Sequence, residues 1–460
     1  MLLDANDQRP VHFVGIAGAG MSALAELFVR RGVKVTGCDA NAIGVDDLRK
    51  LGIDISQGHD PAHVGGARAL VVTSAMPKDH RELEAARAAG IPVVRRAEAL
   101  GEATSGGNRE LVAVAGTHGK STTTVMTADA LGAAGHDPTA LVGARVSRWH
   151  GNLRPGGDRL YVVEADEYDR SFLALSPTVA VVTNVEADHL DIYADLADIR
   201  GAFGEFIRHA RTIVLCGDDP GATNLPTPST SEVVRYGIAS KDARLRAINA
   251  RNDATGAAFA VEYDGDLLGS VKLQVSGTHN VLNALAAVAA GLVVGAPFAG
   301  LAYGLSEFSG AERRFERIGE ARGITLIDDY AHHPTEIAAT LSAARASFPD
   351  RRIVVAFQPH LYSRTRDFAR EFACALCGAD AVYLTEIYAA REKPIAGITA
   401  DLIANAFGPE KRKLAWRGDR AALADALAAG VRDGDVVITM GAGDITKTGP
   451  ELLDRLRRAA

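Results

Sequence analysis

The stretch AVAGTHGKSTTT, residues 113–124, leads from an apolar strand into a helical pattern through a glycine-rich loop. Such a loop turns backbone N–H groups and a helix N-terminus toward phosphates; Lys120 could neutralise the β- and γ-phosphates and Ser121 could ligate Mg²⁺. The general P-loop formula has a glycine where Val114 stands, so the match is to the shorter GTHGKS. A plain glycine turn is the alternative, but lysine in the first turn of a helix is electrostatically unfavourable unless an anion is near. The stretch therefore predicts an ATP-binding loop.

The chain around this loop is too long for one hydrophobic core. It has 460 residues, whereas single cores stop growing at about 250–300 residues. Its 47% hydrophobic and 23% charged residues are ordinary for a soluble globular protein. We therefore expect two or three well-packed domains.

The distribution of charge excludes several classes of partner. A net charge of −7 over both signs provides no basic stripe for nucleic acid and no basic amphipathic helix for a membrane surface. The first residues, MLLDANDQRP, are acidic where a signal peptide has a basic start, and no window approaches about 18 uninterrupted apolar residues. We expect a cytoplasmic monomer or weak homodimer, with no nucleic-acid partner and no membrane insertion.

Four cysteines are too few for a disulfide framework, which also fits a reducing compartment. Cys38 and Cys216 stand singly at the ends of apolar strands. Cys374 and Cys377 form a C-x-x-C inside a helical pattern, without a second pair or a histidine at zinc spacing. We expect these two to be small core thiols.

Short apolar runs alternate with helical patterns along the chain, which is typical of βαβ units and parallel sheets. In the first hundred residues, strands are expected at VHFVGI, VKVTGCD and ALVVTSA. A polar, glycine-rich gap at residues 101–110 is interpreted as a linker. LVAVAG opens a second series, and from about Leu245 alternating runs with D-G turns predict antiparallel hairpins. A third series begins near Arg313.

We therefore predict an α/β fold of three consecutive α/β domains. Residues 1–106 should form a Rossmann-like domain, residues 107–311 a central P-loop ATPase domain with a parallel sheet and antiparallel edge hairpins, and residues 312–460 a second Rossmann-like domain.

A second glycine loop, GIAGAGMS at residues 15–22, follows the first expected strand, and Asp39 ends the second. This arrangement alone indicates a dinucleotide-binding Rossmann turn. The spacing is not a clean G-x-G-x-x-G, although Gly18 and Gly20 come close with Ala23 in the last position. We interpret the loop as a site for a diphosphate-bearing ligand; a tight strand-to-helix turn is the alternative.

Acidic residues gather after two further strands, in EADEYD at 164–169 and TNVEADH at 183–189. The carboxyl ends of strands are where α/β proteins build their sites. Carboxylate and imidazole groups there suit a phosphate-bound Mg²⁺. Glu164 and His189 are the candidates, and a solvated loop is the alternative for any single acid.

Later segments add amide, arginine and histidine side chains. Asn280 and Asn283, one turn apart at a helix start, could read a base edge or cap the helix. GAERRFE, DDYAHHPTE and FQPHLYSRTRD each cluster Arg, His and Asp at a loop or strand end. The further candidates are Arg314, Asp328, His332 and Arg364.

Over essentially the whole chain and in family order, these motifs resemble those of the Mur ligase family. DDYAHHPTE and HFVGIAGAGMS are most similar to the members that add alanine to UDP-N-acetylmuramate. The resemblance implies an ATP-dependent carbon–nitrogen ligase of peptidoglycan precursor synthesis that uses ATP and Mg²⁺. Its small-molecule partners would be UDP-N-acetylmuramate and L-alanine. The first domain would hold the UDP-sugar, the second ATP and the third the amino acid.

The resemblance also implies a role for each motif residue. ATP would contact Gly116, Thr117, His118, Gly119, Lys120, Ser121, Thr122, Asn280, Asn283 and Arg314. The UDP-sugar would contact Gly15, Gly18, Gly20, Met21, Ser22, Asp39, Ser74 and His118. The amino acid would contact Tyr330, His332 and Arg364. Ser121 and Glu164 would bind one Mg²⁺, and His189 would bind a second. The catalytic residues would be Lys120, Glu164, His189, Arg314 and His332.

Three positions depart from the family's commonest pattern. Ala17 stands where glycine is frequent, and Tyr168 stands where serine is frequent. Leu361 stands where many relatives have an arginine, which would leave the amino-acid carboxylate to Arg364.

Several alternatives stay open. A murein-tripeptide recycling ligase would act on the same sugar nucleotide and differ mainly in the third domain. A nicotinamide-dependent dehydrogenase would explain the loop at Gly15 but would leave GTHGKS without a role. A folylpolyglutamate-type ligase would not need the first domain, and a non-catalytic nucleotide-binding module would not consume ATP.

Overall fold

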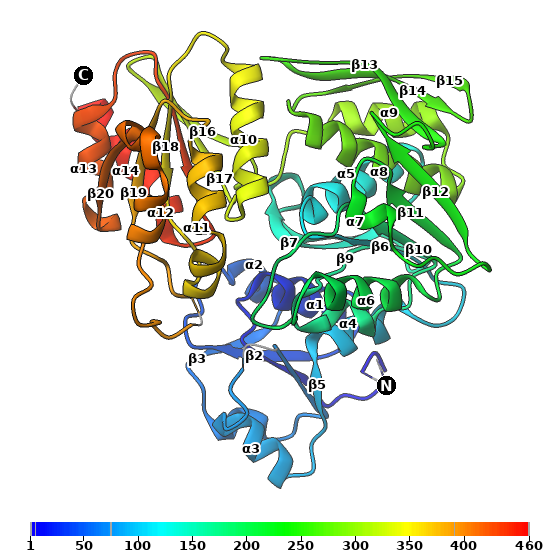
Figure 1. The fold of residues 1–460 in the computed structure, drawn as a ribbon. Helices are drawn as coiled ribbons and strands as arrows, with labels where there is room; N and C mark the ends of the chain where they lie inside the picture. Colours follow the sequence, from blue (N-terminus) through cyan, green and yellow to red (C-terminus); the bar gives the residue numbers. More distant parts are fainter. Residues whose placement is uncertain (1, 5, 74–75, 391, 459–460) are drawn as a thin grey trace.

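The computed structural model describes residues 2–4, 6–73, 76–390 and 392–458. Three sheets follow one another along the chain, with helices packed on them (Figure 1). Most neighbouring strands are parallel, as the alternation of apolar runs and helical patterns predicts. The three-domain α/β class is confirmed. The boundaries after residues 106 and 311 stay a prediction, and each of the three expected segments holds the strands of one sheet.

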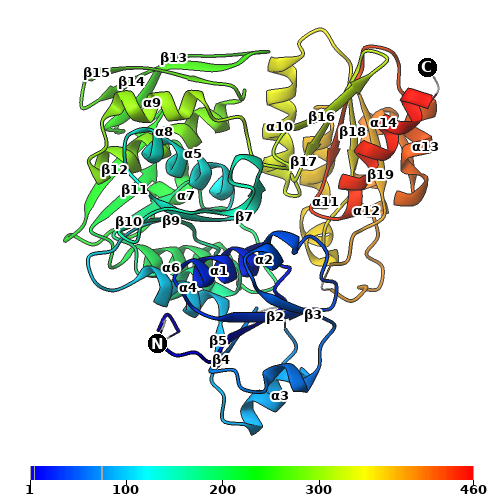
Figure 2. The same cartoon turned by 180° about the vertical axis from the view of Figure 1, so that it is seen from behind.

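The N-terminal sheet is parallel, in the order β3-β2-β1-β4-β5. Its strands are β1 (Val11–Val14), β2 (Val35–Asp39), β3 (Asp54–Gln57), β4 (Ala69–Val72) and β5 (Val93–Arg95). Its helices are α1 (Ala19–Arg30), α2 (Asp46–Lys50), η1 (Pro61–Val64), α3 (Arg81–Ala88) and α4 (Arg96–Thr104). The helices α1 and α4 lie between this sheet and the central domain, and α3 lies on the opposite face (Figures 1 and 2).

The central sheet has ten strands, in the order β15-β14-β13-β12-β11-β10-β6-β9-β7-β8. They are β6 (Glu110–Ala115), β7 (Thr139–Val146), β8 (Gly151–Arg154), β9 (Leu160–Glu164), β10 (Val179–Val182), β11 (Thr212–Cys216), β12 (Glu232–Gly237), β13 (Leu245–Asp253), β14 (Gly256–Tyr263) and β15 (Asp266–Leu273). The helices are α5 (Lys120–Ala133), η2 (Ser147–Trp149), η3 (Tyr168–Ala174), α6 (Leu196–Ile207), α7 (Pro220–Thr223), α8 (Thr278–Val294) and α9 (Phe298–Ser306). The antiparallel edge of β13, β14 and β15 confirms the predicted hairpins.

The C-terminal sheet has the order β16-β17-β21-β18-β19-β20, with only β16 antiparallel to its neighbour among the described strands. The strands are β16 (Glu316–Ala321), β17 (Ile324–Asp329), β18 (Ile353–Phe357), β19 (Ala381–Thr385), β20 (Leu414–Gly418) and β21 (Val436–Met440). The helices are α10 (Pro334–Ser347), α11 (Tyr362–Leu376), α12 (Asp401–Ala406), η4 (Gly408–Lys413), α13 (Arg420–Gly430), η5 (Asp444–Lys447) and α14 (Thr448–Arg458).

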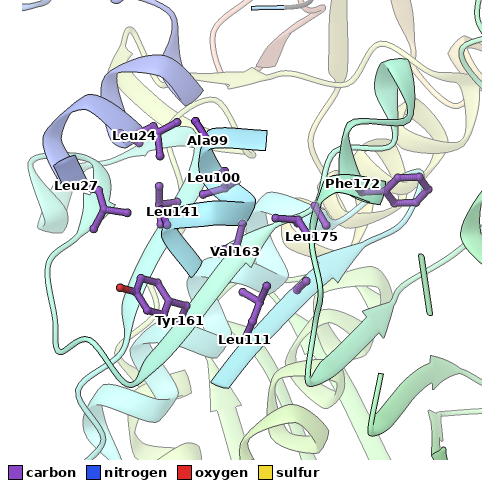
Figure 3. Close-up of a cluster of buried hydrophobic side chains, with 14 of the residues drawn as sticks. Leu24, Leu27, Ala99, Leu100, Leu111, Leu141, Tyr161, Val163, Phe172 and Leu175 are labelled. Carbon is purple, nitrogen blue, oxygen red and sulfur yellow. The ribbon is translucent and has the colours of Figure 1, made fainter. Parts of the chain in front are cut away.

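The N-terminal and central domains share one hydrophobic core. Figure 3 shows Leu24 of α1 and Ala99 of α4 in a cluster with Leu141 of β7 and Val163 of β9. All four side chains are buried. Burial of this kind is the main stabilising term in folding, so the two domains are held firmly against each other.

The expected linker at 101–110 is wrong in its first part, because residues 101–104 belong to α4. A Cβ on Gly101 would lie 2.3 Å from the carbonyl oxygen of Ala174, so this glycine allows two backbones to approach. Gly101 therefore belongs to a close contact between the two domains, whereas Gly106 and Gly107 have open space around them.

The C-x-x-C also differs from expectation. Cys374 is exposed and Cys377 is half-buried, so neither is the core thiol that we predict from the sequence. The buried side of α11 carries Phe372, Ala373 and Leu376. Because successive residues of a helix turn by about 100°, Cys374 points away from Phe372.

Across the described part of the chain, every helix is too short or too polar to cross a bilayer.

Candidate active site

The loop between β6 and α5 needs glycine at two positions. Gly116 and Gly119 have φ angles of 143° and 81°, which L side chains rarely adopt. A Cβ on Gly116 would lie 1.9 Å from Thr183 Oγ1, and one on Gly119 would lie 2.6 Å from Asn283 Oδ1. The loop ends at the N-terminus of α5, where the first N–H groups of a helix lack intrahelical partners and can bind an anion.

Lys120 lies against this loop. Its Nζ donates to the carbonyl of Gly116 at 2.6 Å and pairs with Glu167 at 2.8 Å. Burial opposes the charged form, but Glu167 and then Asp166 raise the pKa of Lys120. The loop therefore carries a permanent cation beside the helix N-terminus, as a phosphate site requires.

The predicted metal ligands fall into two groups. Ser121 Oγ donates to Glu164 Oε1 at 2.9 Å, so this pair is together. His189 lies instead beside Glu167, with Nε2 3.6 Å from Oε1. Glu167 is thus a site residue that the sequence argument does not select, although it belongs to the acidic cluster after β9.

His118 lies where the central and C-terminal domains meet. Its Nε2 is 3.7 Å from Glu186, and its Nδ1 is 3.3 Å from Glu336 on α10. Burial opposes protonation, but Glu336 and Glu186 outweigh it and raise the pKa of His118 to about 9. Thr335 also donates to Glu186 at 2.7 Å across the same boundary. The glycine loop before α5 is therefore linked electrostatically to the C-terminal domain.

A pocket of about 940 Å³ adjoins the glycine loop. Asn280 and Asn283 line it from α8, and Arg314 lines it from the C-terminal domain. Asn283 Oδ1 also accepts from Thr123 at 3.1 Å, so it fixes α8 to α5 as well as facing the pocket. Further predicted residues in the lining are His118, Gly119 and Thr122; lining residues that the sequence argument does not select include Tyr236, His279, Phe308, Phe315 and Asp329.

The two neighbouring aspartates at the end of β17 have different surroundings. Asp328 accepts from Arg313 Nε at 2.9 Å and from Thr446 at 2.8 Å, so it holds structural elements together. Asp329 lines the pocket beside Gly119, and burial raises its pKa to about 6. Of the two, Asp329 is therefore the one that lines this pocket, and Asp328 is not among the lining residues.

A second pocket, of about 1120 Å³, lies between the N-terminal and central domains. The predicted residues Gly15, Gly18, Gly20 and Met21 line one side. Leu141, Gly143, Val163 and Glu164 of the central domain line the other side.

Arg96 contributes a cation to this pocket that we do not predict from the sequence. A Cβ on Gly20 would lie 3.0 Å from Arg96 Nη1, so the glycine lets the guanidinium approach the loop. Arg96 directly follows β5, a short strand that the sequence argument does not predict.

Two other predicted residues form hydrogen bonds with the backbone of the N-terminal glycine loop. Asp39 Oδ2 accepts from the backbone N–H of Ala17 at 3.0 Å, which fastens the glycine loop to the end of β2. Ser22 Oγ donates to the carbonyl of Ala19 at 2.9 Å. Ser74 lies outside the described residues.

The predicted amino-acid residues lie at the junction with α11. Arg364 is buried and donates to Asp188 of the central domain. His332 Nδ1 lies 2.9 Å from the carbonyl oxygen of Tyr330, and burial lowers its pKa to about 4. A space of about 220 Å³ beside Arg364 is lined by Leu361. Leu361 has a φ of 69°, which is unusual for a branched side chain.

Comparison with known proteins places all three domains in one family. Its models match at residues 10–107 (Mur ligase family, catalytic domain), 114–291 (Mur ligase middle domain) and 313–443 (Mur ligase, glutamate ligase domain). A UDP-N-acetylmuramate–L-alanine ligase of Acidothermus cellulolyticus is 46% identical over 97% of this chain and 95% of its own. The crystal structure of a UDP-N-acetylmuramate–alanine ligase from Thermotoga maritima has a TM-score of 0.82 at 30% identity, covering 98% of this chain and 100% of that one. A murein peptide ligase from Psychrobacter arcticus has a TM-score of 0.73 at 26% identity, covering 97% and 98%.

Proposed function

The chain belongs to the Mur ligase family, and we propose from this that it joins L-alanine to the carboxylate of UDP-N-acetylmuramate at the expense of ATP. The products would be UDP-N-acetylmuramoyl-L-alanine, ADP and phosphate, a step in the synthesis of peptidoglycan precursors. We also propose that the reaction takes place in the cytoplasm and that the enzyme is a monomer or a weak homodimer.

One observation carries the proposal. Glu164 lines the pocket that the N-terminal glycine loop forms, and it accepts a hydrogen bond from Ser121 of the phosphate loop. A carboxylate substrate held in the pocket between the N-terminal and central domains can therefore reach the terminal phosphate of a nucleotide held in the pocket beside Gly119. This proximity is what transfer of a phosphoryl group to a carboxylate needs.

In the first step, a carboxylate oxygen of UDP-N-acetylmuramate attacks the γ-phosphorus of ATP and the bond to the ADP oxygen breaks. An acyl phosphate and ADP result. Such a transfer needs mainly positioning and neutralisation of charge. We assign these tasks to Lys120 in the loop and to Arg314, which lies across the nucleotide pocket.

In the second step, the amine of alanine attacks the acyl carbon and phosphate leaves. Alanine must first lose a proton from its ammonium group. We assign His332 to this role because its lowered pKa keeps the imidazole neutral at pH 7. The same low pKa makes His332 a weak base, so deprotonation of alanine by water before binding is the alternative.

Mg²⁺ fits the oxygens of Ser121 and Glu164, since hydroxyl and carboxylate groups are ligands that it accepts. When bound, Mg²⁺ would neutralise phosphate charge. We also propose His189 for a second Mg²⁺, in which case Glu167 beside it would be a further ligand.

The comparisons with relatives support a single amino acid as the acceptor. The relative named as an L-alanine ligase is 46% identical over 97% of this chain, whereas the murein peptide ligase structure is 26% identical. This favours the alanine reaction over the recycling of a murein tripeptide.

The deciding experiment measures phosphate release from ATP and Mg²⁺ by the purified chain with UDP-N-acetylmuramate and one amino acid at a time. We expect fast release with L-alanine and slow release with glycine and serine, since one methylene is worth about 1–3 kcal/mol of discrimination. Release that requires a tripeptide, or release without the sugar nucleotide, would contradict the proposal.

A further inference from the structure

A cluster of His, Cys and Glu side chains, three of them buried and one half-buried, lies in the N-terminal domain, outside the pockets described above. It joins His12 of β1, Cys38 of β2, His63 of η1 and Glu82 of α3. One ligand atom from each of the four lies within 4.8 Å of the others. From this geometry we propose that the four side chains bind one zinc ion.

Glu82 is the centre of the cluster and is fully buried. Its carboxylate lies 3.1 Å from the Cys38 thiol and 2.9 Å from His63 Nδ1. Within the described chain, the ion-pair partners of Glu82 are all histidines, and no lysine or arginine is among them. A buried carboxylate without a permanent cation is costly. A divalent ion at this position would supply the missing positive charge.

His12 is an independent indication of a ligand. The side chain is 2% exposed, and its Nδ1 lies 2.9 Å from the Thr36 hydroxyl. Its Nε2 is buried and has no hydrogen-bond partner among the described residues. A metal-bound histidine uses one ring nitrogen for the metal and the other for a group that orients the ring. Thr36 contacts Nδ1 of His12 and would orient the ring, so His12 Nε2 is the nitrogen that would bind the ion.

The donor set and its spacing fit zinc. Zinc takes four nitrogen, sulfur or oxygen ligands at roughly 2.0–2.3 Å in a tetrahedron, so that ligand atoms lie roughly 3.3–3.8 Å apart. The separations of 2.9 Å and 3.1 Å at Glu82, and the limit of 4.8 Å for the set, require only small shifts of side chains. Mg²⁺ and Ca²⁺ prefer oxygen ligands and do not suit these side chains. Binding would release the proton of the Cys38 thiol to solvent, because the thiolate is the ligand.

Four protein ligands fill all four coordination positions of the zinc ion and leave none for water or a substrate. This is typical of a structural zinc site and not of a catalytic one. Glu82 belongs to α3, which lies on the face of the sheet away from the central domain (Figure 1). Cys38 directly precedes Asp39, which fastens the glycine loop through the N–H of Ala17. The ion would therefore stabilise the strand ends that support the diphosphate pocket.

His59 and His80 form a second, three-residue group with Glu82, which we call the outer group. His59 Nδ1 is 3.0 Å from one carboxylate oxygen, and His80 Nδ1 is 3.8 Å from the same oxygen. His59 Nδ1 also lies 3.4 Å from Cys38 Sγ. The outer group has one ligand fewer than the four-residue cluster and does not include the thiol, so we place the ion in the four-residue cluster.

The test uses the full chain without a histidine tag, stripped of metal by a chelator and then titrated with Zn²⁺ or Co²⁺. We expect one ion per chain and, with Co²⁺, a thiolate-to-cobalt charge-transfer band. Cys38→Ser should abolish the band. Cys216→Ser is the matched control, because Cys216 is also buried at a strand end but lies in the central domain.

Thr36→Val tests the orienting role and should weaken zinc binding by roughly 10- to 100-fold. Circular dichroism of each metal-free variant establishes that a lost site is not an unfolded chain. Absence of stoichiometric binding, or a cobalt band that survives Cys38→Ser, would overturn the proposal. Loss of binding in His59→Asn with normal binding in His63→Asn would also overturn it, because the ion would then lie in the outer group.

Discussion

Arg364 donates two hydrogen bonds to one oxygen of Asp188, from Nε at 3.1 Å and from Nη2 at 2.6 Å. Asp188 follows β10 in the central domain, and Arg364 lies on α11 in the C-terminal domain. Both side chains are buried, so the pair connects the domains where we expect alanine to bind. Burial opposes ionisation of Asp188, but Arg364 and then His189 hold its pKa well below the usual range. The pair therefore stays charged at neutral pH.

We predict that Arg364→Lys raises the Michaelis constant for alanine and leaves that for UDP-N-acetylmuramate nearly unchanged. A lysine keeps the charge but cannot reproduce the planar fork that meets a carboxylate with two parallel bonds. A lost charged hydrogen bond is worth about 1.5–3 kcal/mol, or roughly 10- to 100-fold. Leu361 offers no second cation, so this chain should depend strongly on Arg364. An unchanged alanine constant, or a defect confined to the sugar nucleotide, would show that Arg364 serves the domain contact alone.

Lys120→Ala should reduce ATP-dependent phosphate release by about 100-fold or more, because it removes a cation that stabilises the transition state. The substitution also leaves Glu167 buried without its partner. A fall in melting temperature is therefore expected as a separate effect. The double variant Lys120→Ala/Glu167→Gln should recover stability but not activity. Near-normal turnover by a folded Lys120→Ala variant would remove the lysine from the phosphate site.

The N-terminal pocket should bind UDP-N-acetylmuramate and not NAD. Calorimetry needs the full chain, because Leu141 and Glu164 of the central domain complete the pocket around Gly18. Arg96→Ala should weaken binding of UDP-N-acetylmuramate, since it removes the cation closest to Gly20. Binding of NAD with none of the UDP-sugar would support the dehydrogenase alternative for this domain.

The sequence predicts the regular elements well and the contacts between domains poorly. Buried strands such as β10 and β18 are runs of apolar and β-branched residues, and they are recognisable without any tertiary information. His118 and Glu336 come together only because the third domain packs on the second. No local sequence pattern predicts this contact between domains.

The same limit explains the choice between neighbouring acids. Asp328 and Asp329 lie at the end of one strand, and successive side chains of a strand point to opposite faces. Both are acidic, so composition does not tell which one faces the nucleotide pocket. Likewise, His12, Cys38, His63 and Glu82 are far apart in the sequence and become a cluster only through the order of the strands.

Two glycine substitutions test the packing of the first two domains. Gly101→Ala should destabilise the chain by about 1–3 kcal/mol, because the new Cβ has to displace backbone. It would lie 2.3 Å from the carbonyl oxygen of Ala174. Gly201→Ala is the matched control, since it is also within a helix but has open space around the new Cβ. It should stabilise by about 0.5–1 kcal/mol. Equal effects in denaturant melts would contradict the close packing at Gly101.

The last prediction concerns the pH dependence of stability at the contact between His118 and Glu336. The folded chain raises the pKa of His118 from 6.5 to about 9. Protonated His118 therefore contributes stability that is fully present below pH 6.5 and is lost as the pH rises through about 9. The difference in unfolding free energy between the chain and His118→Gln should shrink across this range.

His333 provides the control with the opposite sign, because its ring is centred 4.7 Å from that of His118. Burial lowers the pKa of His333 from 6.5 to about 4. Between pH 6.5 and 4, His333 is protonated in the unfolded chain and neutral in the folded chain. His333 therefore lowers the free energy of unfolding as the pH falls through this range. Removing it in His333→Gln should make the chain less sensitive to acid, whereas His118→Gln should make it less sensitive to base. Chemical denaturation of both variants from pH 5 to 10 separates the two effects. If the difference in unfolding free energy between the chain and His118→Gln stays constant with pH, His118 is not charged between Glu186 and Glu336.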